Sequence, residues 1–130
     1  MSKYILTALC AGLCLSAFAE GTAEAPSGYT LRWQDEFNGS ALNEAIWNIE
    51  VNGNGGGNQE LQYYRRENVS VGTDPATGDN CLILTARREN FAGKAFTSGR
   101  VTTQNKAAFR HGMIQARIKF PRTANGLWPA

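Results

Sequence analysis

Residues 113–120 constrain the fold more than any other part of this 130-residue chain. Their side chains alternate between two faces, with Ile114, Ala116, Ile118 and Phe120 on one and Met113, Gln115, Arg117 and Lys119 on the other. Successive side chains of a β-strand point to opposite faces of the sheet, so this strict period of two indicates a half-buried strand. The sequence therefore predicts a strand here, and a chain whose structure is built from sheets.

The rest of the chain has the same character. Helical periodicity is nearly absent, and we expect only one short helical turn, at residues 42–45, where Ser40 or Asn43 can cap it. Residues 73–80 (TDPATGDN) form a turn-rich connection. Five further strands are expected at residues 29–33, 60–64, 68–71, 81–87 and 99–104, of which 81–87 is apolar enough to be the more buried. This pattern is typical of an all-β sandwich or barrel.

The first 19 residues have the features of a secretory signal peptide. Lys3 supplies a positive start, residues 4–15 are largely apolar, and Ala17-Phe18-Ala19 is a cleavage signal before Glu20. The apolar stretch is shorter than the roughly 20 residues that a membrane-spanning helix needs. We therefore expect an exported protein, periplasmic or extracellular, without a membrane span. Residues 20–28 are expected to be a linker, and residues 29–130 to belong to one domain.

Cleavage would leave one cysteine, Cys81, and one histidine, His111. No intrachain disulfide is then expected, and Cys81, at the start of an apolar run, is predicted to act as a small hydrophobe. A transition-metal site made of His and Cys lacks its ligands. The composition therefore indicates no required cofactor.

The charges are unevenly distributed. Residues 20–89 hold 11 acidic and 5 basic residues, whereas residues 90–130 hold 7 basic residues and no acidic one. Such asymmetry can mark a nucleic-acid surface, but the late cations are scattered along strand-like sequence and form no basic run. We expect no nucleic-acid partner, and we expect the acidic neighbours of these cations to lie beyond residue 130.

Six segments carry a family resemblance, in order: WQDEFNG (33–39), LNEAIW (42–47), NQELQYY (58–64), TSGR (97–100), HGMIQARIKFP (111–121) and GLWPA (126–130). Each is a weak motif by itself, but their order is specific. Together they resemble glycoside hydrolase family 16, most of all its bacterial endo-β-1,3-glucanase (laminarinase) branch, with mixed-linkage glucanases close by.

The resemblance implies a curved, antiparallel jelly-roll β-sandwich of the concanavalin-like type, of which residues 29–130 would be the N-terminal half. It also implies a secreted endo-β-glucanase that hydrolyses β-1,3 or mixed β-1,3-1,4 glucans with retention, using two carboxyl groups about 5–5.5 Å apart. The family's Glu-x-Asp-x-x-Glu motif follows the GLWPA-like segment and does not occur in these 130 residues. We therefore expect no catalytic residue in this chain, no activity of the chain by itself, and poor folding because strand edges are left unpaired.

The resemblance also points to substrate-binding residues. Arg100 would hydrogen-bond sugar hydroxyls with its planar fork of donors, or it would simply pair with an acidic neighbour. Trp128 would stack on a sugar ring or pack in the core. The glycine-rich loop supplies Asn52 and Asn58, unless it is only a flexible connection. Tyr63 and Glu60 are expected at the rim of the cleft. Alternatively, Glu60 holds the loop in place. The core is expected to take Trp33 and Trp47.

The family further implies a structural calcium, for which the Glu36 backbone carbonyl is a ligand of the right kind. The expected partner is a β-glucan polysaccharide, and the full-length protein is expected to be a monomer. Two alternatives use the same sandwich: a non-catalytic glucan-binding protein and a purely structural or adhesion domain. The glucan-binding alternative shares Arg100, Trp128 and the loop with the enzyme, so residues beyond Ala130 would separate the two.

Overall fold

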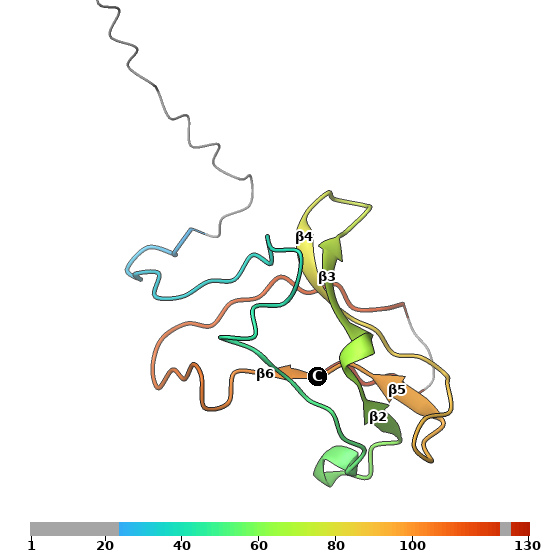
Figure 1. The fold of residues 1–130 in the computed structure, drawn as a ribbon. Coiled ribbons are helices and arrows are strands. Elements are labelled where there is room, and N and C mark those ends of the chain that lie inside the picture. Colours follow the sequence, from blue (N-terminus) through green and yellow to red (C-terminus); the bar gives the residue numbers. More distant parts are fainter. Residues whose placement is uncertain (1–23, 123–125) are drawn as a thin grey trace, which may run out of the picture.

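The computed structural model describes residues 24–122 and 126–130, so the expected signal peptide and the start of the expected linker lie outside the described residues. The described part is all-β and contains no α-helix. Its elements, shown in Figure 1, are β1 (Asn48–Ile49), η1 (Gly55–Gly57), β2 (Gln62–Tyr64), η2 (Arg66–Asn68), β3 (Val69–Thr73), β4 (Asn80–Leu84), β5 (Phe96–Ser98) and β6 (Val101–Thr102). Both η elements are short 3-10 turns, and neither has the length or apolar run that a membrane-spanning helix needs.

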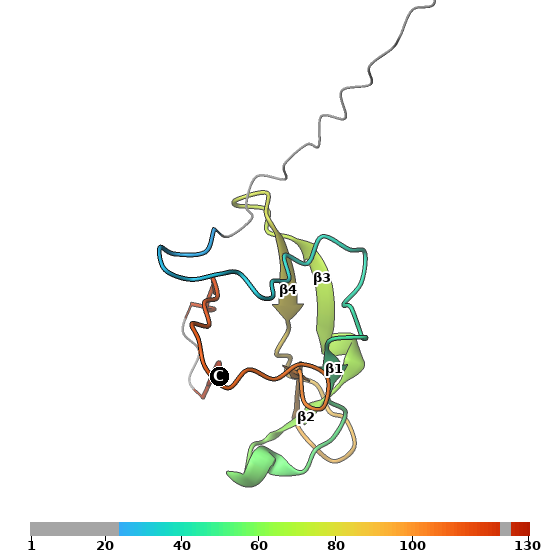
Figure 2. The same ribbon diagram turned by 90° about the vertical axis from the view of Figure 1, so that its left-hand side faces the viewer.

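The strands form three separate two-stranded sheets. β1 pairs with β6 and β3 pairs with β4, both antiparallel, whereas β2 pairs with β5 in parallel, with Tyr64 opposite Ser98. Figure 1 shows the β3–β4 hairpin above β6, Figure 2 shows it above β1, and β2 lies below in both views. The expected antiparallel sandwich is therefore not seen in the described residues, because a sandwich requires two larger sheets that bury each other's inner faces.

The β3–β4 hairpin confirms the turn predicted at residues 73–80. The Asp74 backbone N–H donates to the Asp79 carbonyl oxygen at 2.8 Å, and the Asp74 carboxylate accepts from the Ala76 N–H at 2.9 Å. Gly78 closes the turn with a φ of +80°, a backbone angle that glycine adopts without strain. The prediction of burial was wrong, since Ile83 and Leu84 are 38% and 46% exposed. No second sheet covers that face of the hairpin in the described residues.

The helical turn expected at residues 42–45 is present as a single turn. The Asn43 carbonyl oxygen accepts from the N–H groups of Ile46 (3.0 Å) and Trp47 (2.9 Å), and its side-chain oxygen accepts from the Ala45 N–H (3.1 Å). Asn43, not Ser40, is therefore the capping residue. Lys106 fixes this turn from across the fold by donating to the Trp47 carbonyl oxygen at 2.7 Å.

Two predicted strands, 29–33 and 113–120, are wrong: both segments are irregular. A strand is defined by backbone hydrogen bonds to a neighbour, and neither segment has a neighbouring strand among the described residues. The apolar face of residues 113–120 is consequently open to solvent, with Ile114, Ile118 and Phe120 84%, 63% and 60% exposed. The alternating pattern is real, but its apolar face has nothing here to pack against.

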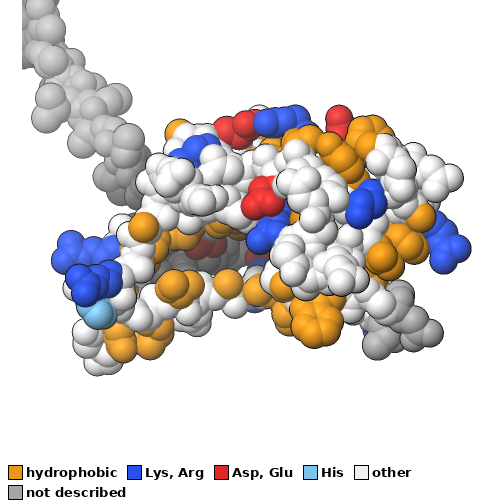
Figure 3. Space-filling view, turned by 90° about the horizontal axis from the view of Figure 1, so that it is seen from below, with side chains coloured by type: hydrophobic (Ala, Val, Ile, Leu, Met, Phe, Trp, Pro, Cys, Tyr) orange, Lys and Arg blue, Asp and Glu red, His pale blue; other side chains and the backbone are white. Residues whose placement is uncertain are grey.

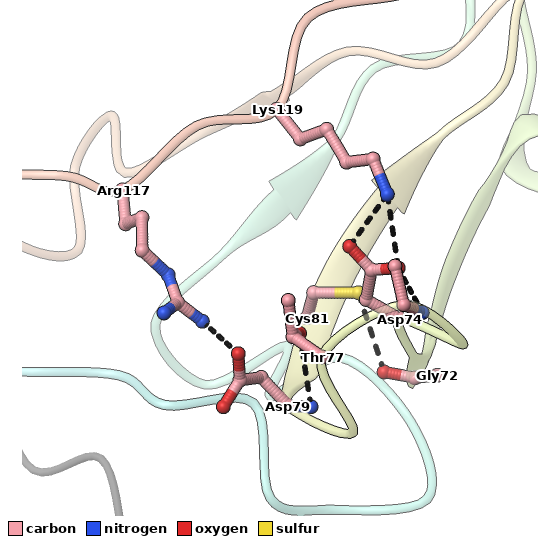
Figure 4. A network of polar contacts seen from close by, with 8 residues as sticks. Gly72, Asp74, Thr77, Asp79, Cys81, Arg117 and Lys119 are labelled. Carbon is pink, nitrogen blue, oxygen red and sulfur yellow. Dashed lines mark hydrogen bonds and ion pairs between the residues drawn. The ribbon is translucent and has the colours of Figure 1, made fainter.

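The polar face of the same segment is held by the hairpin turn (Figure 4). Lys119 Nζ lies 2.8 Å from Asp74 Oδ2, and the Arg117 guanidinium pairs with the Asp79 carboxylate. This corrects the expectation that the acidic neighbours of these cations lie beyond residue 130. Arg117 and Lys119 are therefore paired with acidic residues of the earlier part of the chain, and Arg100 lies near Glu50 in the same way.

The most buried side chains are polar. Asn68 and Thr97 are 1% and 0% exposed, and among the apolar residues described only Tyr64, at 9%, is buried. Asn68 Nδ2 donates to the Thr85 carbonyl oxygen (2.8 Å) and to Thr97 Oγ1 (3.0 Å), and Thr97 Oγ1 donates to Glu89 Oε1 (2.5 Å). Because buried polar groups need partners, these hydrogen bonds join Asn68, at the end of η2, to Thr97 in β5.

The expected core tryptophans pack in a separate aromatic cluster. The ring centroids of Trp33 and Trp47 are 5.7 Å apart, and Phe37 and Phe109 flank them at 6.1 and 6.0 Å. Trp47 also donates its indole N–H to Asp35 Oδ2 at 2.7 Å. Trp33 nevertheless remains 36% exposed, so the cluster is an open apolar surface rather than a closed core.

Candidate functional site

The candidate site starts from three side chains on one face of the chain at β2. Glu60, Gln62 and Tyr64 are two residues apart, so an extended backbone points them to the same side. They form a closed triangle: the Tyr64 hydroxyl donates to Glu60 Oε2 at 2.6 Å, and Gln62 Nε2 donates to Glu60 Oε2 at 3.0 Å and to the Tyr64 hydroxyl at 2.9 Å. This triangle is the rigid base of the site.

The glycine-rich loop folds onto this base. The N–H groups of Asn58 and Glu60 both donate to the Gly55 carbonyl oxygen at 3.0 Å, which closes the η1 turn. With its amide nitrogen turned inward, the Asn58 side chain donates to Glu60 Oε1 at 3.2 Å and to the Gly55 carbonyl oxygen at 3.1 Å. The loop is therefore anchored by hydrogen bonds and is more than a flexible connection.

The other side of the site is built by Glu50, Asn52 and Arg100. The Tyr64 backbone N–H donates to the Asn52 carbonyl oxygen at 2.7 Å, and Asn52 Nδ2 reaches Glu50 Oε2 at 3.4 Å. Arg100 Nε lies 3.6 Å from Glu50 Oε1, and its guanidinium carbon lies 5.6 Å from the centre of the Tyr64 ring. The structure thus brings four of the predicted residues, Arg100, Asn52, Asn58 and Glu60, around Tyr64.

Arg100 has the acidic neighbour that was considered as the alternative to sugar binding. Its side chain is still 44% exposed, and a guanidinium carries five N–H donors, so one contact with Glu50 leaves donors for another group. Sugar binding by Arg100 stays a prediction.

Tyr63 and Trp128 lie outside this cluster. Tyr63 points to the opposite side of β2, where its ring packs edge-on against Phe91 with centroids 5.1 Å apart and covers Gly53 closely. Trp128 is 87% exposed, which excludes core packing in this structure, and Figure 2 shows the end of the chain away from β1. A stacking role for Trp128 stays a prediction.

Burial gives Tyr64 a fixed protonation state. Desolvation of its phenol is the main cause that raises its pKa, and the hydrogen bond to Glu60 raises it further. The phenol therefore remains protonated at neutral pH and acts as the donor to the Glu60 carboxylate.

Carboxyl groups elsewhere are arranged for ion pairing. The pKa of Glu44 is lowered mainly by its hydrogen bond to Arg66, that of Asp74 by Lys119, that of Asp79 by Thr77 and that of Glu89 by Thr97. A general acid in a glycosidase needs the opposite shift. The lowered pKa values of these four carboxyl groups therefore do not suit the role of general acid.

The described residues contain no group of three or more His, Cys, Asp or Glu side chains that could hold a metal ion. Near Glu36, the Asp35 carboxylate is already occupied by the Phe37 N–H (2.9 Å) and the Trp47 indole (2.7 Å). Calcium takes six to eight oxygen ligands, and the Glu36 carbonyl alone does not supply such a shell. Calcium at Glu36 stays a prediction.

Figure 3 views the molecule from below and shows acidic and basic side chains next to each other among apolar ones. Several basic side chains gather at the left-hand end of this face, and others stand singly.

Comparison with known proteins identifies relatives of the chain, although no protein-family model matches it. The chain is 39% identical over 103 residues to a Rhodothermus marinus protein named "Beta-glucanase", covering 78% of this chain and 35% of that protein. It is 38% identical over 123 residues to "Glucan endo-1,3-beta-glucosidase" of Cryptopygus antarcticus (91% and 41%). It is also 39% identical over 102 residues to "Clotting factor G alpha subunit" of Tachypleus tridentatus (77% and 14%).

Comparison with solved structures also finds laminarinases. The laminarinase of Rhodothermus marinus matches with a TM-score of 0.50 and 44% identity, over 61% of this chain and 31% of that one. The catalytic domain of an endo-1,3-beta-glucanase (laminarinase) from Thermotoga petrophila matches with a TM-score of 0.54 and 35% identity, over 64% and 34%. The chain is a homologue of the laminarinase-like glucanases of glycoside hydrolase family 16.

This chain spans only about a third of the first of these laminarinase-like relatives, 35% of its length. The described residues match the Thermotoga petrophila structure over 34% of its length, which supports the expected relation to jelly-roll proteins. The sheets of this chain itself are two-stranded. Sequence reasoning missed Gln62, Tyr64 and Glu50 as members of the site. The spacing of Glu60, Gln62 and Tyr64 could have found two of them, because period two places all three on one face.

Proposed function

We propose that this chain is part of an exported endo-β-glucanase that hydrolyses β-1,3 or mixed β-1,3-1,4 glucans with retention, and that its own residues bind the glucan. The observation that carries the proposal is the polar cluster around Tyr64, in a homologue of proteins named glucanases. Sugar hydroxyls both donate and accept hydrogen bonds, and the cluster offers both kinds of group. The two catalytic carboxyl groups, about 5–5.5 Å apart, would lie outside these 130 residues.

Each group in the cluster has a chemical part in this proposal. The Arg100 guanidinium would donate to hydroxyl or ring oxygens, and the Asn52 amide would donate and accept. Trp128, with most of its surface free, would stack on the apolar face of a glucose ring. Such contacts position a glucan without acting on it, so the chain by itself should bind without cleaving.

Binding is tested with the full chain by calorimetric titration with laminarihexaose, a β-1,3-linked glucose oligomer, and with cellohexaose, its β-1,4 counterpart. We expect laminarihexaose to bind and Arg100→Ala to weaken it by about tenfold, the value of one charge-assisted hydrogen bond. Arg110→Ala, which removes an exposed cation elsewhere, is the matched control. Equal binding by the two arginine variants would contradict the assignment of Arg100.

A second candidate is a non-catalytic glucan-binding protein on the same fold. It is favoured by one observation: a relative at 39% identity is named a clotting factor subunit rather than a glucanase. Both candidates need the Tyr64 cluster, so a binding measurement does not separate them. Sequencing the source DNA beyond codon 130 separates them. A Glu-x-Asp-x-x-Glu motif on a strand-like segment would support the enzyme, and a continuing frame with those carboxylates replaced would support the binding protein.

Export and calcium belong to the same proposal. N-terminal sequencing of the protein from a secreting host should begin at Glu20, and retention of Met1 would contradict export. A structural calcium bound through the Glu36 carbonyl should raise the melting temperature on addition of CaCl₂, and an unchanged melting curve would remove calcium from the proposal.

A further inference from the structure

Glu60 is placed to do more than line a rim. Its carboxylate accepts from three side chains: Tyr64 at 2.6 Å and Gln62 at 3.0 Å on Oε2, and Asn58 at 3.2 Å on Oε1. An ionised carboxylate has about four acceptor positions, so three of them are used within the protein. A group that is saturated in this way is poorly suited to hold a sugar and well suited to hold the loop.

The loop is tied to the same strand at both ends. At its start, the Asn52 carbonyl oxygen accepts from the Tyr64 backbone N–H at 2.7 Å. At its end, Asn58 and the Tyr64 hydroxyl meet on the Glu60 carboxylate. Tyr64 therefore contacts one end of the loop through its backbone and reaches the other end through Glu60.

The middle of the loop lies directly on the carboxylate. A Cβ atom added to Gly56 would stand 2.5 Å from Glu60 Oε1 and 2.6 Å from Oε2. Gly57, with a φ of +83° against +56° for Gly56, would meet nothing within 4 Å. An alanine at position 56 would therefore displace the Glu60 carboxylate, in addition to any cost of the backbone angle.

We propose that Glu60 is a positioning residue whose ionised carboxylate fixes residues 52–58 in the conformation that presents Asn52 beside Arg100. The saccharide part rests on the proposed function, while the loop part rests on the contacts above. Glutamine at this position would place an amide donor among donors from Gln62, Asn58 and Tyr64. The side chain at position 60 must therefore carry a negative charge and accept several hydrogen bonds, whereas its size matters less.

The first test uses the free full chain and amide hydrogen exchange read by mass spectrometry. In the native chain, the Asn58 and Glu60 N–H groups are protected by the Gly55 carbonyl oxygen. Glu60→Gln should speed exchange over residues 55–60 by about tenfold while the β3–β4 hairpin is unchanged. Glu67→Gln, which removes an exposed carboxylate paired with Arg65, is the matched control. Unchanged exchange in Glu60→Gln would overturn the proposal.

A second pair of variants keeps the test decisive if Glu60→Gln does not fold. Gly56→Ala and Gly57→Ala both carry the cost of a positive φ, but only the alanine at position 56 meets the carboxylate. Loop exchange should therefore rise more in Gly56→Ala, and the excess should vanish in the background of Glu60→Ala, as a double-mutant cycle measures. Equal effects of the two alanines would overturn the role of Glu60.

The saccharide arm separates this proposal from the proposed function. Laminarihexaose affinity should fall about tenfold in Glu60→Gln together with faster loop exchange, and Glu67→Gln should leave both unchanged. If the native chain binds no saccharide, the proposed function fails, whereas faster loop exchange in Glu60→Gln still supports the positioning role. If affinity is kept while the loop loosens, the positioning role for the ligand is overturned.

Discussion

At the scale of single residues, Tyr64 makes more of the contacts that hold the candidate site together than its sequence neighbours suggest. It is the buried apolar side chain of the described fold, and it donates both its hydroxyl and its backbone N–H to the candidate site. The sequence analysis placed Tyr63, and not Tyr64, at the rim of the site. Two adjacent tyrosines face opposite sides of a strand, and only the pairing of β2 with β5 decides which side is enclosed.

The raised pKa of Tyr64 gives a prediction for alkaline pH. Its folded-state pKa lies above the ordinary value of 10.0, through burial and then the hydrogen bond to Glu60. The neutral phenol is favoured by folding, so its contribution to stability is complete below pH 10 and is lost as the pH rises through the raised value. The tyrosinate absorbance of the native chain should include a late-titrating component that Tyr64→Phe removes. An identical titration curve for the variant would contradict this assignment.

Gly99 makes a prediction about packing. A Cβ at this position would lie 2.5 Å from the Asn68 backbone oxygen, which accepts a hydrogen bond from the Thr85 backbone N–H at 2.8 Å. Gly99→Ala should therefore lower the free energy of local opening around this bond by about 1–3 kcal/mol, as overpacking does. Gly72→Ala is the matched control, because its new Cβ meets only the flexible end of Ile83, at 3.1 Å. Amide hydrogen exchange of the Thr85 N–H compares the two variants, and equal acceleration would contradict the role of the Asn68 backbone.

At the scale of elements, local chemistry was predictable and long-range pairing was not. The turn at residues 73–80 and the single turn capped by Asn43 follow from side chains that bond their own backbone. The segment 113–120 has the alternation of a strand but lacks a neighbour to pair with, so its pattern alone did not make it one. The parallel pairing of Gln62 with Phe96 joins segments far apart in sequence, and no local signal encodes it.

The contact between residues 113–120 and the hairpin should depend on pH and salt. The pKa of Asp74 is lowered chiefly by Lys119, and that of Asp79 by Thr77 and then Arg117. Lowered values mean that the attraction is present above the ordinary pKa of 3.8 and is lost as the pH falls through the folded-state values. The distance between one label on residues 113–120 and another on the hairpin turn, read by fluorescence energy transfer, should therefore increase in acid.

These ion pairs are exposed, so salt should screen them as well. The double variant Asp74→Asn with Asp79→Asn should show the acid behaviour already at neutral pH, while Glu24→Gln should not. A segment that stays equally close to the hairpin turn in the double variant would show that contacts other than these ion pairs hold it in place.

At the scale of the whole molecule, the described residues bury too little apolar surface to behave as an independent domain. Two-stranded ribbons are marginal in water without a face to pack on, and here large side chains such as Trp128, Ile114 and Leu61 are 87%, 84% and 68% exposed.

A cooperative domain of about 100 residues absorbs roughly 60–80 kcal/mol on melting. Calorimetry of the full chain should give a broad transition with a much smaller enthalpy, and dye binding should report exposed apolar surface before heating. A sharp two-state transition of a monomer with an enthalpy in that range would contradict this view. It would mean that these three two-stranded sheets, together with the buried Asn68–Thr97 hydrogen bond, are enough to hold the chain in one cooperative fold.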